Sequence, residues 1–104
     1  MAYKPLPDEI TTGPDGTLKQ KLTIKNKLGL HARPAALFVQ TANRFKCELS
    51  VQKGRERVNG KSIMGIMMLA AGPGMHIMVE AKGDDARQAL AALAALVDSN
   101  FGEM

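Results

Sequence analysis

The spacing of the apolar residues switches repeatedly between two periods, and this switching most limits which folds the chain can adopt. Alternation at every second residue predicts half-buried strands, while spacings of three and four predict amphipathic helices. The expected strands lie near residues 22–24, 47–53, 55–59 and 77–81, and the expected helices begin near Ala32, Ser62 and Ala86. The resulting order, β-α-β-β-α-β-α, predicts an α+β domain whose small sheet is covered by helices on one face.

The first seventeen residues differ in composition from the remainder of the chain. They hold three of the five prolines and show no apolar periodicity. We therefore expect residues 1–17 to form a flexible tail and residues 18–104 to form the folded domain. A chain of 104 residues leaves room for one such domain.

Composition excludes several classes of protein. No apolar run approaches the roughly 18–20 residues that cross a bilayer, and the first residues lack the apolar stretch of a signal peptide, so a cytoplasmic protein without membrane insertion is expected. The single cysteine, Cys47, lies in an apolar alternation and is expected to be buried rather than in a disulfide or zinc site. The net charge of +4 favours acidic protein partners over nucleic acid, because the chain has no Trp and no dense Lys/Arg block.

The segment Gly29 to Ala35, GLHARPA, combines residues that suit reversible binding of an anion. His31 is predicted at the start of a helix, where the amides of Ala32 and Arg33 have no intrahelical acceptor. Arg33 adds a permanent cation with a planar donor group, and Pro34 is tolerated in the first turn because its missing N–H would have been unpaired. We therefore interpret His31 and Arg33 as catalytic residues for phosphoryl transfer, with Ala32 and Arg33 binding the phosphate.

Other interpretations of His31 stay open. A lone histidine at a helix start is usually a cap or an ordinary surface residue. A metal site is a weaker alternative, because the second histidine, His76, lies on an expected strand without a nearby pair of carboxylates. No metal or other cofactor is therefore expected. The positive helix end disfavours imidazolium, so we expect a neutral His31 nucleophile at pH 7.

Ser62 precedes a short apolar segment, SIMGIMMLA, and is a plausible N-cap. On a two-turn helix some of the apolar side chains face the core and others face outward. The inward set is Ile66, Leu69 and Ala70, and the outward set is Ile63, Met64 and Met67. An exposed apolar set predicts a docking surface, with core filling as the alternative. A phosphate on Ser62 would add negative charge at the edge of this surface.

Two stretches, KNKLGLHARPAALFV and VNGKSIMGIMMLA, resemble the HPr family, the histidine phosphocarriers of the bacterial phosphoenolpyruvate:sugar phosphotransferase system. The resemblance covers about residues 19–100. It implies an open-faced β-sandwich with a four-stranded antiparallel sheet and three helices. It further implies that His31 takes a phosphoryl group on Nδ1 from enzyme I and passes it to EIIA components of sugar permeases. Leu28 departs from the asparagine that some members carry three residues before the histidine.

The resemblance also bears on regulation. KSIMG matches the serine that HPr kinase/phosphorylase modifies in many members, which implies regulatory phosphorylation at Ser62. Because the chain has neither a P-loop nor a carboxylate pair for magnesium, we expect a phosphoryl carrier rather than an enzyme with its own small substrate. The alternative is a regulatory binding module on the same fold, either the nitrogen-related paralogue or a corepressor that recruits a transcription factor through phosphorylated Ser62.

Overall fold

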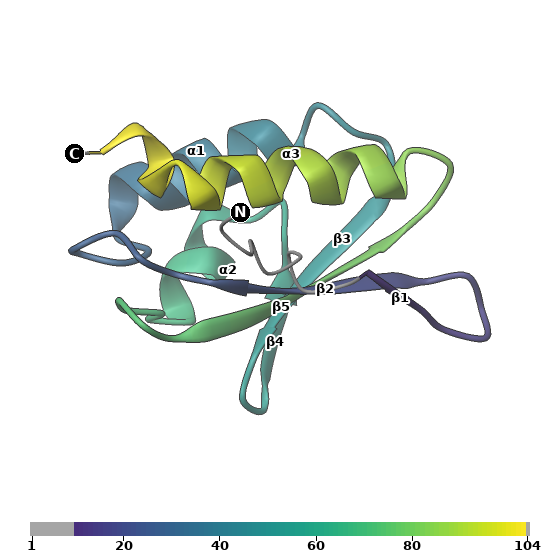
Figure 1. The fold of residues 1–104 in the computed structure, drawn as a ribbon, viewed down its shortest axis with the longest axis horizontal. Helices are drawn as coiled ribbons and strands as arrows, with labels where there is room; N and C mark the ends of the chain where they lie inside the picture. Colours follow the sequence, from purple (N-terminus) through teal and green to yellow (C-terminus); the bar gives the residue numbers. More distant parts are fainter. Residues whose placement is uncertain (1–9, 104) are drawn as a thin grey trace, which may run out of the picture.

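The computed structural model describes residues 10–103, which form one antiparallel sheet packed against three α-helices (Figure 1). The strands are β1 (Thr11–Thr12), β2 (Leu18–Thr23), β3 (Glu48–Lys53), β4 (Glu56–Asn59) and β5 (His76–Lys82). The helices are α1 (Ala32–Ala42), α2 (Ile63–Met68), α3 (Ala86–Asp98) and a 3-10 turn, η1 (Asn100–Gly102). The strands lie in the order β1-β2-β5-β3-β4, so β5, late in the chain, pairs between β2 and β3.

The predicted α+β class and open antiparallel sheet are confirmed, but the sheet has five strands where four were expected. The additional strand is β1, which pairs with β2. Its hairpin closes because the carboxylate of Asp15 accepts hydrogen bonds from the amide and hydroxyl of Thr17, at 3.0 and 2.9 Å. The prediction of a tail at residues 1–17 is therefore corrected for residues 10–17, where this local turn overrides the proline-rich composition. Residues 1–9 lie outside the described part of the chain.

The core lies between the sheet and the helices. Alternate side chains of the central strands point into it, among them Leu22, Val51 and Val79. From the other side Phe38 of α1 and Leu90 of α3 fill the space, and both are fully buried. Figure 1 shows α1 and α3 lying side by side across one face of the sheet, and α2 packs against α1 and β4. Within the described residues, the opposite face of the sheet carries no helix.

Asp85, the residue predicted to cap α3, makes its side-chain hydrogen bonds to a different segment of the chain. Asp85 occupies the N-cap position, as expected, but its side chain makes no cap hydrogen bond. Instead its carboxylate accepts from the amides of Lys46 and Cys47 at 2.8 and 2.9 Å. These bonds, above all the one from Lys46, lower the pKa of Asp85. Cys47 is buried as predicted, and its burial together with Asp85 raises the pKa of its thiol to about 11, which leaves it an unreactive core residue.

The open face of the sheet carries several ion pairs. Glu80 on β5 is almost completely buried, and its carboxylate lies 3.0 Å from Arg57 and 3.9 Å from Lys19. Lys82 lies 3.5 Å from Asp15 of the β1 hairpin. Within residues 10–103, none of the helices has the length and apolar character that crossing a membrane requires.

Candidate functional site

The N-terminus of α1 presents the imidazole of His31 beside backbone donors. His31 has extended backbone angles at the N-cap position, as predicted, and its carbonyl accepts the amide of Ala35 at 2.9 Å. No side chain among residues 10–103 caps this helix, so the first-turn amides of Ala32 and Arg33 keep their donors free. The His31 side chain is 35% exposed, which leaves the ring accessible to a partner. Pro34 is buried inside the first turn.

Gly29 shapes the loop that delivers His31 to the helix. Its φ is +68°, a left-handed conformation that costs other residues free energy. A Cβ at this position would collide with the carbonyl oxygen of Ala71 and lie 2.8 Å from the Cα of Gly72. The close approach allows the amide of Leu30 to donate to Ala71 at 2.9 Å. The loop before His31 is therefore attached directly to the segment that follows α2.

Two further backbone hydrogen bonds strengthen this attachment. The amide of Ile24 donates to the carbonyl of Met75 at 2.9 Å, and the amide of Gly74 donates to the carbonyl of Ile24 at 2.7 Å. These bonds join the segment that leaves β2 to the segment that enters β5. The His31 loop and the residues that follow α2 consequently form one connected unit.

The carboxylate of Glu103 contacts the imidazole, and sequence reasoning missed it. Its Oε2 lies 3.2 Å from Nε2 of His31, and its Oε1 accepts from Nδ2 of Asn26 at 3.1 Å. The same Nδ2 donates to the carbonyl of Gly29 at 2.8 Å. The neutral ring expected for His31 stays a prediction. The Asn26–Gly29 spacing is a turn signal, but nothing in the sequence near Glu103 points to a residue 72 positions away.

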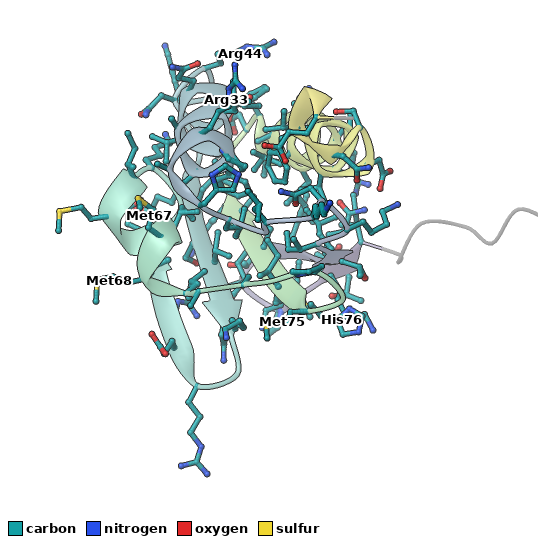
Figure 2. All side chains as sticks on the ribbon, turned by 90° about the vertical axis from the view of Figure 1, so that its left-hand side faces the viewer. Arg33, Arg44, Met67, Met68, Met75 and His76 are labelled. Carbon is teal, nitrogen blue, oxygen red and sulfur yellow. The ribbon has the colours of Figure 1, made fainter. Side chains whose placement is uncertain are left out.

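Arg33 lies on the exposed surface of α1, and Figure 2 shows it with Arg44 at the top of the view, on the outer side of this helix. The Arg44 guanidinium stands over the ring of Phe45, 5.6 Å from its centre. Arg33 is thus the cation that follows His31 in the same helical turn, and it faces solvent. An exposed guanidinium in this place can meet an anion bound at the helix end.

Exposed apolar side chains of α2 form a surface that we call the α2 patch: Ile63, Met64, Met67 and Met68. The predicted exposure of the first three is confirmed, and Met64 is 74% exposed. Met68, 66% exposed, was missed, and Figure 2 shows Met67 and Met68 projecting away from the helix. Ile66 and Leu69 are buried as predicted. Ala70 is exposed instead, because α2 ends at Met68 and Ala70 adopts a φ of +50°.

Ser62 caps α2. Its hydroxyl oxygen accepts from the amide of Gly65 at 3.0 Å, which confirms the predicted N-cap. The residue is half-buried, and it directly precedes the exposed side chains of Ile63 and Met64. A charge added to this hydroxyl would therefore lie at the start of the α2 patch.

The remaining candidates do not join the site. Leu28 is 70% exposed and apolar, so this position supplies no hydrogen bond to His31. His76 is exposed, as predicted, and its Nδ1 lies 2.8 Å from the hydroxyl of Thr23. Figure 2 shows His76 at the opposite end of the view from Arg33. Within the described residues no group of three His, Cys, Asp or Glu side chains is placed to hold a metal ion.

Comparison with known proteins decides the family. The model for the PTS HPr component phosphorylation site matches residues 18–99, most of the chain. This chain belongs to the HPr family. It is 55% identical over 86 residues to the phosphocarrier protein HPr of Neisseria meningitidis, an alignment that covers 83% of this chain and 97% of the relative. The protein is accordingly a phosphocarrier of the phosphotransferase system.

Two further similarities bear on fold and function. The crystal structure of HPr-C-His from Thermoanaerobacter tengcongensis matches with a TM-score of 0.80 and 51% identity, covering 83% of this chain and 97% of that one. The HPr-like protein Crh of Bacillus subtilis is 49% identical over 80 residues, covering 77% of this chain and 94% of the relative. Because the aligned lengths nearly equal those of the relatives, the family resemblance extends over their whole domain.

Proposed function

We propose that His31 carries the phosphoryl group on Nδ1 as a stoichiometric intermediate, without itself being an enzyme for a small substrate. The observation that carries this proposal is the half-exposed imidazole at the N-cap of α1, beside the free amides of Ala32 and Arg33. These donors and the positive end of the helix dipole stabilise a phosphate dianion. The Arg33 guanidinium contributes a further charge at the same place.

In this transfer the Nδ1 lone pair of His31 forms a bond to phosphorus while the bond between phosphorus and the donor group breaks. The electron pair of the broken bond stays with the donor. The reverse pattern, with His31 as leaving group, delivers the phosphoryl group to the acceptor. Both directions are accessible because binding the phosphate uses backbone amides that need no rearrangement.

A labelling experiment tests the carrier role. The full chain is incubated with phosphoenolpyruvate and enzyme I, and acid-labile phosphate is measured on the wild type and on His31→Ala. We expect no stable labelling of His31→Ala. The matched control is His76→Ala, which removes the other exposed histidine and should label normally. Equal labelling of His31→Ala and the wild type would contradict the proposal.

We further propose that enzyme I is the donor, that EIIA domains of sugar permeases are the acceptors, and that all of these partners dock on Ile63, Met64 and Met67. Family membership supports this choice of partners. Exposed methionines suit such a role because their flexible, polarizable side chains adapt to different surfaces. The transfers would take place in the cytoplasm. Amide shifts of the α2 patch on addition of enzyme I test the docking, and unchanged shifts there would contradict it.

Ser62 is proposed as a regulatory phosphorylation site for an HPr kinase/phosphorylase. Its half-buried hydroxyl already lies at a helix start, where phosphate is electrostatically favoured, and a dianion there would oppose docking of an apolar or acidic surface. Treatment with a purified kinase and ATP should label the wild type and not Ser62→Ala. Labelling of Ser62→Ala at the wild-type level would place the modification elsewhere.

A second candidate is a regulatory binding module that recruits a transcription factor through phosphorylated Ser62. The similarity to the HPr-like protein Crh favours it beside the carrier role. The same fold in the nitrogen-related paralogue is the other form of this candidate. Selective capture of a transcription factor by the Ser62-phosphorylated chain, and not by the unmodified chain, would support it.

A further inference from the structure

The chain folds back sharply after α3. Three consecutive residues, Asn100, Phe101 and Gly102, have positive φ values of 55°, 56° and 73°. For the two that are not glycine this left-handed conformation costs free energy, so the surrounding structure must hold it in place. Phe101 provides the hold, because its side chain is only 4% exposed and belongs to the hydrophobic core. The amide of Glu103 then donates to the carbonyl of Asn100 at 2.9 Å.

This turn directs Glu103 into the site rather than into solvent. Both oxygens of its carboxylate are engaged, Oε2 at 3.2 Å from Nε2 of His31 and Oε1 at 3.1 Å from Nδ2 of Asn26. Asn26 is 3% exposed and is itself fixed by its bond to the carbonyl of Gly29. The carboxylate is therefore held by a buried amide in the very loop that positions His31.

The contact distinguishes the two ring nitrogens. A carboxylate is only an acceptor, so the bond at 3.2 Å requires the proton to be on Nε2 of His31. In the neutral ring the lone pair then belongs to Nδ1. A bond to a fixed acceptor also limits rotation of the ring about its side-chain torsions.

We propose that Glu103 is a positioning residue for phosphoryl transfer: it holds Nε2–H of His31 and thereby presents the Nδ1 lone pair for the reaction. This proposal rests on the proposed function of His31. As the Nδ1–phosphorus bond forms and the donor–phosphorus bond breaks, no proton leaves the ring, which gains positive charge. The Glu103 carboxylate stabilises that charge through the retained Nε2–H bond.

The opposite effect is also conceivable physically, because a carboxylate repels an arriving phosphoryl group. The geometry favours the positioning role, since the carboxylate contacts Nε2, the nitrogen across the ring from the one that reacts. The positive end of α1 and Arg33 lie at the same site and offset the added negative charge. The direction of the rate change therefore separates the two effects.

The experiment compares Glu103→Ala and Glu103→Gln with the wild type in the full chain. The ¹⁵N and ¹H resonances of the His31 ring report which nitrogen carries the proton and how fast Nε2–H exchanges with water. Phosphorylation by enzyme I and phosphoenolpyruvate reports the rate. Glu56→Gln is the matched control, because it removes the same charge from an exposed position on β4.

For Glu103→Ala we expect faster exchange of Nε2–H and phosphorylation slowed about threefold to tenfold, the effect of losing one typical hydrogen bond. Glu103→Gln keeps an acceptor oxygen without the charge, so it should retain the protected Nε2–H and lose less of the rate. Glu56→Gln should match the wild type in both measurements.

Three results would overturn the proposal. They are an unchanged ring spectrum and rate in Glu103→Ala, faster phosphorylation of that variant, or equal rate losses in both Glu103 variants with an unchanged ring spectrum. The last result would indicate a structural role only. The ring spectrum is recorded without any phosphate donor, so it tests Glu103 even if His31 proves not to be the phosphorylated residue.

Discussion

Two regions of the surface, the open face of the sheet and the start of α1, differ in how many of their polar groups have a partner within the protein. On the open face of the sheet, Glu80 is matched by Arg57 and Lys19, and Lys82 by Asp15. At the start of α1, no residue between 10 and 103 accepts from the amides of Ala32 and Arg33, and the nearby α2 patch exposes methionines to water. Exposed amides at a helix start bind water in the free protein and can exchange it for an anion, and a contiguous exposed apolar patch is typical of an interaction site. The difference teaches that the proposed site uses donors and apolar side chains that the fold leaves available.

The largest expected effect compares two glycines with positive φ. Gly54, in the turn between β3 and β4, has open space where a Cβ would lie, so Gly54→Ala should cost about 1–2 kcal/mol of unfolding free energy from backbone strain alone. Gly29→Ala should cost about 1–3 kcal/mol more, because the Cβ meets the backbone of Ala71 and Gly72. Urea unfolding monitored by circular dichroism measures both. Equal losses of unfolding free energy in the two variants would show that the His31 loop can shift to make room for the added methyl group.

The next comparison tests the α2 patch against the open face with the same substitution. Met64→Gln should weaken transfer from enzyme I about threefold to tenfold, since it removes an exposed apolar side chain from the proposed docking surface. Met78→Gln changes a half-buried methionine on β5, away from that surface, and should leave transfer unchanged. Initial rates at varied concentrations of the carrier measure the effect. Equal behaviour of the two variants would argue against docking on α2.

A smaller effect is expected at two serines. Ser62→Ala removes the N-cap hydrogen bond to Gly65 and should lower the unfolding free energy by about 0.5–2 kcal/mol. Ser50→Ala, on β3, removes a hydroxyl that caps no helix and should change it by less than about 0.5 kcal/mol. Thermal unfolding of both variants provides the test. A Ser62→Ala variant as stable as the wild type would show that the cap contributes little.

The smallest effect concerns pH on the open-face side. Hydrogen bonds from the amide and then the hydroxyl of Thr17, with the charge of Lys82, lower the pKa of Asp15. A carboxyl whose pKa is lower in the folded state adds stability above its unfolded pKa of about 4, and the contribution is lost as the pH falls through the folded value. The Thr17 amide shift should follow this titration, and Asp15→Asn should remove it. A Thr17 shift that titrates identically in Asp15→Asn would exclude Asp15 as the cause.

Much of the fold was predictable because the periods of apolar residues were clear. The order of elements, the buried Cys47 and the Ser62 cap follow from local patterns, which are read within a few residues. The β1 hairpin was missed because Asp15 closes its turn within a segment whose prolines indicate disorder. Asp85 was placed correctly at the start of α3, but its hydrogen bonds go to Lys46 and Cys47, 39 and 38 residues away.

The residues of the candidate site also divide into those that local sequence patterns predict and those that they do not. His31, Arg33 and the first-turn amides could be inferred because they are adjacent in sequence and a helix end brings them together. Glu103 could not, because its place depends on three successive positive φ values and on the burial of Phe101. Met68 lies one helical turn after Met64 on the same face of α2, so the spacing that placed Met64 outward could also have found it.

The backbone bonds from Leu30 to Ala71 and between Ile24 and the Gly74–Met75 segment join the histidine loop to the segment following α2. If both regions serve phosphoryl transfer, these bonds fix the distance between Nδ1 of His31 and the α2 patch. Every protein that donates or accepts the phosphoryl group must then fit this same distance. Substitutions that improve the fit of one particular complex would then have to occur in the partner protein, while the geometry of this chain stays the same for all partners.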